Sequence, residues 1–199
     1  MSYTDLVESI TLEGSHILLA PLSLSHHPQL CRHGLDESLW RDTTIRLETA
    51  EDMLTYLQTA LREQAEGKTL PFVIIEKGSG EIIGTSRYHN INTSQRRLEI
   101  GFTWIAVPWQ RTIVNTEAKY LMLRHAFERY QCVRVEFKAD SSNERSRRAL
   151  IRIGAKEEGV PRNYVISSHK GMRDLVLFSI VDSEWPQVKA NLEEKLKTH

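Results

Sequence analysis

The sequence is short of cysteine, of long apolar runs and of any excess of charge, and each shortage excludes a class of protein. Its two cysteines, Cys31 and Cys132, lack the close spacing of metal ligands or a redox pair, so we expect reduced, buried thiols and no metal. No apolar run approaches the roughly 20 residues that span a bilayer. Lys+Arg and Asp+Glu balance at 26 each, which removes the basic surface typical of a nucleic-acid binder.

The start of the chain also lacks the charged and then apolar pattern of a secretory signal. We therefore expect a cytoplasmic protein without a membrane or nucleic-acid partner. A length of 199 residues is long for one domain and short for two, so we predict a single domain over residues 1–199.

The first half of the chain alternates between strand and helix patterns. Residues 16–24 (HILLAPLSL) are predicted to form a short buried strand. Helices are predicted over residues 28–34 and 50–66, the second because apolar residues recur at helical spacing. Thr49 is a suitable N-cap for this second helix, and Gly67 is a suitable residue to end it.

Three strands are predicted next. Residues 71–77 and 81–91 are joined by Gly-Ser-Gly, which favours a hairpin. Residues 98–106 alternate between apolar and polar side chains, so one face of this strand should be apolar, formed by Leu98, Ile100, Phe102 and Trp104. Short turns between the three strands predict an antiparallel meander.

A helix of about four turns then separates the strand 98–106 from another predicted strand, 133–140, which is a crossover long enough for the two to run parallel. Asn115 is a good cap for this helix. The backbone amides of residues 111–116 would then converge where the helix dipole is positive, and such a position either binds an anion or simply joins a strand to a helix.

The next predicted helix, residues 141–153, carries two polar side chains toward the parallel strands. Ser141 and Glu144 match a capping box, and Gly154 follows the last turn. Asn143 and Ser146 share one face at the start of the helix. This face should point between the two parallel strands.

The order and spacing of these segments resemble the GNAT superfamily of N-acetyltransferases, in particular the branch of ribosomal-protein N-terminal acetyltransferases. The resemblance runs through HILLAPLS, GTSRYHNI, RLEIGFTWIAVPWQR, NTEAKYLMLRHAFE, RVEFKAD, NERSRRALIRIGAKEEG and RDLVLFSIVDSEW. It implies an α+β fold with a mostly antiparallel sheet of six to seven strands, one central parallel pair, and helices on both faces. It also implies acetyl-CoA as co-substrate and an amine as acceptor.

The same resemblance implies a binding site for acetyl-CoA. The strand end at Trp104, Ile105 and Ala106 would contact the pantetheine arm, and Asn143 would bond this arm or an ordered water. The following turn would hold the phosphates, through Gln110, Arg111, Thr112, Ile113, Val114, Asn115 and Thr116. Ile113 and Asn115 stand where the family has small glycine-type residues, which predicts a looser phosphate cradle in this chain.

Two residues are predicted to take part in catalysis. Glu99 lies where some family members that acetylate protein amines carry a glutamate base, and Ser146 matches a serine near the departing thiolate. Two other family positions have no counterpart, because Leu150 replaces a tyrosine acid and Val165 lies near the slot of a second glutamate.

The sequence leaves open which amine accepts the acetyl group and whether the protein is a monomer or a homodimer. An α-amino group has a pKa of about 7.7–8.0 against about 10.4 for lysine, which favours a protein N-terminal amine where the base is weak. A small amine such as a polyamine, amino acid or antibiotic is the alternative acceptor, and a degenerate acyl-CoA-binding module is an alternative of another class. The C-terminal segment predicts an amphipathic helix that packs on the domain or serves a homodimer, so monomer and homodimer both remain possible.

Overall fold

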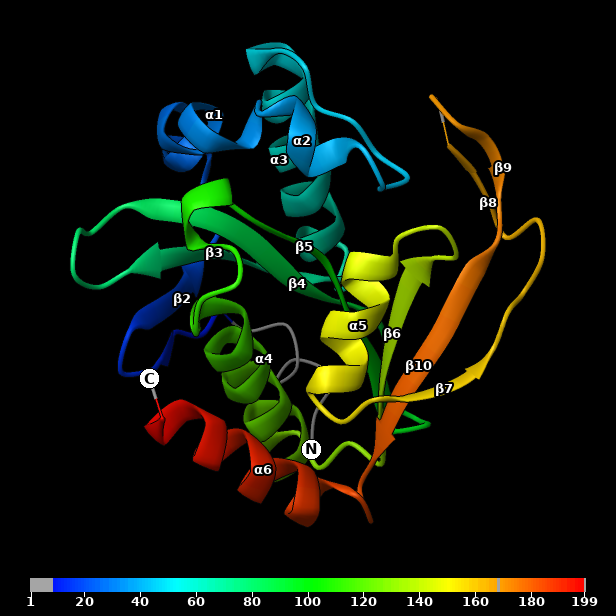
Figure 1. Ribbon diagram of the computed structural model, residues 1–199. Helices are drawn as coiled ribbons and strands as arrows, with labels where there is room; N and C mark the ends of the chain where they lie inside the picture. Colours follow the sequence, from blue (N-terminus) through cyan, green and yellow to red (C-terminus); the bar gives the residue numbers. More distant parts are fainter. Residues whose placement is uncertain (1–8, 168, 199) are drawn as a thin grey trace.

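The protein is built on an eight-stranded sheet, seen in a computed structural model that describes residues 9–167 and 169–198 (Figure 1). The strands are β1 (Leu12–Glu13), β2 (Ile17–Pro21), β3 (Leu70–Glu76), β4 (Ile82–Asn92), β5 (Arg97–Ile105), β6 (Arg134–Asp140), β7 (Lys156–Gly159) and β10 (Leu175–Val181), in the order β1-β2-β3-β4-β5-β6-β10-β7. A separate hairpin contains β8 (Val165–Ser167) and β9 (Gly171–Arg173). The helices are α1 (His27–Gly34), α2 (Glu37–Trp40), α3 (Ala50–Ala65), α4 (Val114–Arg124), α5 (Glu144–Arg152) and α6 (Trp185–Lys197).

The sheet confirms the predicted topology, since β5 and β6 pair in parallel near its middle and the other neighbouring strands are antiparallel. Helix α4, extended by a π-helical turn over His125–Arg129, makes the crossover between them. The sheet exceeds the predicted six to seven strands. Its outermost strands are the reason, because β1 has two residues and β7 reads KEEG, so neither carries an apolar alternation.

Helices cover both faces of the sheet, as predicted (Figure 1). One core lies between the strands and α1, α2 and α3, and includes Leu30, Trp40, Met53, Leu57, Val73 and Trp104. The larger core lies between the strands and α4, α5 and α6, and includes Phe72, Tyr88, Leu121, Phe137, Phe178 and Leu192. Successive residues of β3, such as Phe72 and Val73, point into opposite cores, as the period of a strand requires.

Strand β5 departs from its predicted alternation. Phe102 has a φ of +50° and is 41% exposed, and the pairing with β4 shifts its register at this point. Leu98 and Ile100 face α4, whereas Trp104 packs in the opposite core, so the prediction of a single apolar face through Trp104 was wrong. The physical reason is a β-bulge, which inserts one residue and reverses the facing of every side chain beyond it.

The two parallel strands also separate. Their pairing covers only Arg97 to Glu99 on β5 against Arg134 to Glu136 on β6. Beyond Glu99, the second half of β5 continues along β4, while β6 stays paired with β10. A gap between the two strands therefore opens toward the start of α4.

Two predicted helix caps were wrong, and one was confirmed. Helix α4 starts at Val114, one residue before the predicted cap Asn115, with no side-chain cap at Ile113. Helix α5 is capped by Asn143, whose side chain accepts from the Ser146 amide, so the predicted capping box from Ser141 is absent. The side chain nearest to the free amides determines the cap, and sequence spacing alone does not fix which side chain that is. The cap of α3 by Thr49 was predicted correctly.

Candidate active site

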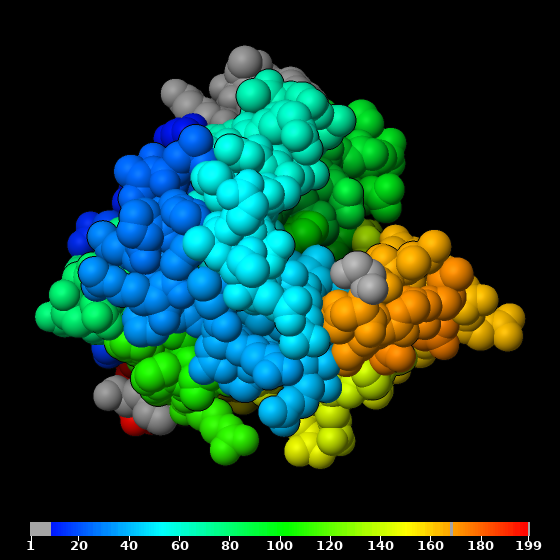
Figure 2. All heavy atoms as spheres, turned by 90° about the horizontal axis from the view of Figure 1, so that it is seen from above, coloured from blue at the N-terminus to red at the C-terminus, as the bar shows by residue number. Residues whose placement is uncertain are grey.

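A cleft of about 1160 Å³ occupies the gap between β5 and β6. Its middle is apolar and includes Ile105, Phe137, Ala139, Leu150 and Ile153. One end is rich in arginine, and the other is bordered by the loop after α2 and by the β8–β9 hairpin. Figure 2 shows this loop against the hairpin, with the surface hollowed beside them.

The arginine-rich end lies where the turn after β5 meets α5. Arg111, Arg145, Arg148 and Arg152 line it. Gln110 connects the two elements, because its Nε2 donates to the Ile105 carbonyl at 2.9 Å and its Oε1 accepts from Arg145 Nη1 at 2.9 Å. This end therefore gathers positive charge beside the N-terminus of α4, where anions are favoured.

The turn before α4 has a conformation that allows an anion to approach the backbone. Arg111 has a φ of +62°, in the left-handed region, and such turns direct successive amides inward. Thr112 shapes the turn, since its hydroxyl donates to the Trp109 carbonyl and accepts from the Val114 amide. Asn115 lies in the first turn of α4 and lines the cleft.

The structure brings together most of the predicted site residues. The cleft is lined by Glu99, Trp104, Ile105, Gln110, Arg111, Asn115, Asn143 and Ser146. The side chains of Ala106, Thr112, Ile113, Val114 and Thr116 do not line it. Val114 and Thr116 belong to the first turn of α4 and are buried. The Ala106 amide donates to the Ile83 carbonyl on β4 at 2.7 Å. Because successive amides of a strand point in opposite directions, the Ile105 amide points toward β6.

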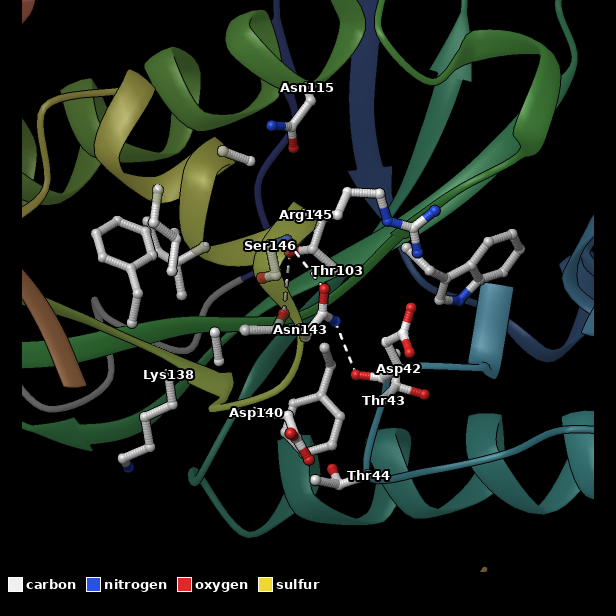
Figure 3. A pocket seen from close by; sticks show the side chains of 18 of the residues that line it. Asp42, Thr43, Thr44, Thr103, Asn115, Lys138, Asp140, Asn143, Arg145 and Ser146 are labelled. Carbon is white, nitrogen blue, oxygen red and sulfur yellow. Dashed lines mark hydrogen bonds between the residues drawn. The ribbon is translucent and has the colours of Figure 1, made fainter. Parts of the chain in front are cut away.

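Asn143 joins the start of α5 to the loop after α2 at the mouth of the cleft (Figure 3). Its Oδ1 accepts from the Ser146 amide at 3.0 Å, and its Nδ2 donates to the Asp42 carbonyl at 2.8 Å. The loop after α2 is thereby fixed to the start of α5, with Asp42, Thr43 and Thr44 on the cleft wall. In this structure Asn143 positions the wall, and its predicted contact with the cofactor stays a prediction.

Glu99 lies at the floor of the cleft, in a cluster of charged and polar groups. It is 3% exposed, accepts from Lys138 Nζ at 2.6 Å and Asn90 Nδ2 at 2.9 Å, and lies 3.4 Å from His89 Nε2. Burial disfavours its charged form, but His89 and Lys138 more than offset this and lower the pKa of Glu99 from 4.5 to about 2. A carboxylate with so low a pKa accepts protons poorly, and its predicted role as base stays a prediction.

Several lining residues were missed by sequence reasoning. Lys119 on α4 was not singled out from the sequence, but it is buried and its amine donates to Thr103, which also lines the cleft. Lys138 Nζ lies over the Tyr164 ring, 5.2 Å from its centroid, and both residues line the cleft. The available sequence signal for Lys119 was a lysine flanked by apolar residues in a helix, AKYLML (118–123), which is weak.

Neither cysteine lines the cleft. Cys132 is buried as expected, whereas Cys31 is only half-buried. Over residues 9–167 and 169–198, no cluster of His, Cys, Asp and Glu is placed to hold a metal ion. Within the same residues, every helix is too short or too polar to cross a membrane.

Comparisons with known proteins agree on one family. Residues 16–156 match the family described as "Acetyltransferase (GNAT) domain". The chain is 36% identical over 108 residues to "Putative ribosomal N-acetyltransferase YdaF" of Bacillus subtilis, which covers 53% of this chain and 57% of that protein. It is 25% identical to "Uncharacterized N-acetyltransferase p20" of Bacillus licheniformis, covering 88% and 98% of the two chains. A solved "putative acetyltransferase" from T. thermophilus is 37% identical, with a TM-score of 0.85 over 94% of this chain and 96% of that one.

Proposed function

Because the chain belongs to the acetyltransferase (GNAT) domain family, we propose that it transfers the acetyl group of acetyl-CoA to a primary amine by direct attack. The observation that carries this proposal is the gap between β5 and β6, which leads from the arginine-rich turn to a polar floor. The acceptor proposed is a protein N-terminal amine.

The residues of the cleft fit acetyl-CoA. Phosphates suit the end lined by Arg111, Arg145 and Arg148, next to the amides at the start of α4. A thin pantetheine arm suits the apolar gap, where the backbone of β5 faces β6 without a paired strand. Bound there, the thioester supplies an activated acetyl carbonyl.

Direct attack requires an amine in its free form, a donor for the carbonyl oxygen and a proton for the thiolate. We assign the Ile105 amide, which points into the gap, as the donor to the carbonyl oxygen. We assign to Ser146, which lines the cleft at the start of α5, a hydrogen bond to the departing sulfur. A covalent acetyl-cysteine is not part of this scheme, since both cysteines lie outside the cleft.

Two considerations support an N-terminal amine as acceptor. The relative YdaF is named as a ribosomal N-acetyltransferase, although the match spans 57% of its length. An α-amino group, with a pKa of about 7.7–8.0, is also far more often uncharged at neutral pH than a lysine at about 10.4. This difference matters in a cleft whose carboxylate Glu99 is a weak base.

The test is acetyl-CoA consumption with a panel of acceptors. We would compare peptides with free N-termini, the same peptides with blocked N-termini and one internal lysine, and small amines such as polyamines and amino acids. Turnover restricted to free N-termini supports the proposal. Turnover restricted to small amines would support acetyltransferase activity but reject a protein N-terminal amine as the acceptor.

A non-catalytic acyl-CoA-binding module is the second candidate, favoured by the pairing of Glu99 with Lys138 and by Ile113 and Asn115 in the phosphate turn. Calorimetry with CoA decides between the two. Tight binding of CoA without turnover of any acceptor would favour the module. Failure to bind CoA would reject both functions.

A further inference from the structure

Lys119 is a buried lysine inside the cleft that the reaction described above does not use. It lies in the second turn of α4 and is 5% exposed. Its Nζ donates to Thr103 Oγ1 on β5 at 2.7 Å and lies 6.0 Å from the centroid of the Phe137 ring. All three residues line the cleft. The amine therefore lies at the gap between β5 and β6, two positions along the strand from Ile105.

The surroundings of Lys119 disfavour its charged form. Burial lowers the pKa of Lys119 from 10.5 to about 7. Among the residues that the structure describes, no carboxylate forms an ion pair with it. A buried ammonium with three N–H donors and one hydroxyl partner is poorly compensated, so the free amine is well populated at neutral pH.

The carboxylates on α4, β5 and β6 have other partners. On α4 itself, Glu117 accepts from the amides of residues 15–17 near β2, and Tyr120 donates to Glu193 on α6. On β5 and β6, the charged side chains point to the opposite face from Phe137 and pair there, as Glu99 with Lys138, Glu136 with Arg134 and Asp140 with Arg173. None of these carboxylates therefore offsets the burial that lowers the pKa of Lys119.

We propose that Lys119 carries the proton of the acetyl transfer, taking it from the attacking amine and giving it to the departing thiolate. The inference rests on the proposed function and deepens it. It assigns the proton transfer to α4, whereas sequence reasoning sought it in Glu99 on β5.

The step balances without a further reagent. The free amine R–NH2 forms a bond from its nitrogen to the thioester carbonyl carbon, and the C=O π pair moves onto oxygen, so that nitrogen becomes positive and oxygen negative. The lone pair of the Lys119 amine takes one proton from this nitrogen. The oxygen pair then re-forms the carbonyl as the carbon–sulfur bond breaks with its electron pair on sulfur, and the Lys119 ammonium returns the proton to the thiolate. The products are R–NH–CO–CH3 and CoA–SH, with Lys119 again uncharged.

Thr103 is the positioning residue in this scheme. Its hydroxyl accepts from Lys119 and also bonds Ser86 Oγ at 2.7 Å, which fixes it between β4 and β5. The bond to Thr103 stabilises the ammonium. Loss of this hydroxyl should therefore lower the pKa of Lys119 further and move the pH dependence of the reaction with it.

The experiment compares wild type, Lys119→Met and Thr103→Val, with Lys68→Met as a matched control at an exposed lysine outside the cleft. Methionine keeps the length of the side chain and removes the amine. We expect kcat to fall about 10²–10⁴-fold in Lys119→Met, with CoA affinity by calorimetry little changed and the control unaffected. In Thr103→Val, the acidic limb of kcat/KM against pH should move to lower pH.

A second measurement does not depend on turnover. In wild type, the NMR signals of isotope-labelled lysine ε-carbons should include one that titrates near pH 7, and Thr103→Val should shift it. This titration decides the matter if Lys119→Met does not fold. The proposal is overturned if every lysine titrates near its ordinary pKa, or if Lys119→Met keeps the rate and pH profile of an active wild type.

Two further outcomes are informative. Stable acetylation of Lys119 itself, seen by mass spectrometry of tryptic peptides, would overturn the proposal, because the amine would then be consumed as a nucleophile. Absence of turnover by wild type with every acceptor would reject the proposed function and this inference with it. If wild type is active but Lys119→Met keeps its rate and pH profile, the inference fails and the proposed function stands.

Discussion

Replacing Glu99 by glutamine should destabilise the protein in a manner that depends on pH. The carboxylate is buried and bonds Lys138 and Asn90, and its pKa is lowered from 4.5 to about 2. A fall of this size corresponds to about 3 kcal/mol of folding free energy at neutral pH. Glu99→Gln also leaves the partly buried Lys138 without its counter-charge, which adds to the loss.

The sign follows from the direction of the shift. Because the folded-state pKa of Glu99 lies below the unfolded value, its contribution is complete above about pH 4.5 and is lost as the pH falls toward 2. The free-energy difference between wild type and Glu99→Gln should therefore shrink by about 2 kcal/mol between pH 7 and pH 3.

Urea unfolding at a series of pH values measures this difference. Glu13→Gln is the matched control, because Glu13 also bonds a lysine, Lys77 at 2.8 Å, but at the surface, where little stabilisation and little pH dependence are expected. A difference that stays constant from neutral to acid pH would refute the reasoning, since it would mean that Glu99 titrates at its ordinary pKa when folded.

Three further substitutions test contacts that hold α5, β4 and α4 in place around the cleft. Asn143→Ala removes the cap of α5 and the bond to Asp42, so the free energy of unfolding should fall by about 1–2 kcal/mol and the dissociation constant for CoA should rise. Asn143→Asp keeps the cap and loses only the bond to Asp42. Wild-type affinity of this variant for CoA would show that the bond to Asp42 is dispensable. Gly84→Ala places a Cβ 2.1 Å from the Trp104 carbonyl oxygen, so thermal unfolding should show a loss of about 1–3 kcal/mol, and an unchanged midpoint would contradict the packing of β4 on β5. Glu117→Gln weakens three charge-assisted hydrogen bonds to backbone amides near β2, so the free energy of unfolding, measured by urea denaturation, should fall by about 1–3 kcal/mol. An unchanged free energy of unfolding would mean that these amides find other partners.

The parts of the fold that follow local rules could be predicted from the sequence. Helix α3 was predicted with its cap at Thr49, because a capping side chain and apolar spacing act within a few residues. The parallel pairing of β5 with β6 followed from the length of the crossover. The bulge at Phe102 could not be predicted, because a non-glycine residue with positive φ leaves no mark in composition and is imposed by the pairing with β4.

Some residues of the candidate site could likewise be predicted from the sequence, and others could not. The turn after β5 and the start of α5 were located through the resemblance, and Gln110, Arg111 and Asn143 do line the cleft. The partners of these residues could not be inferred, because the Asp42 carbonyl lies 101 positions away in the sequence from Asn143. Lys119 was missed for a related reason, since its burial depends on strands that pack over α4.

The separation of β5 from β6 leaves two strand edges facing each other inside the domain. Exposed strand edges commonly recruit strands from other chains and promote aggregation. Here the edges lie inside a cleft that is also lined by residues of α4 and α5. A ligand that bridges them would also bind only the folded state, so the midpoint of thermal unfolding should rise with ligand concentration.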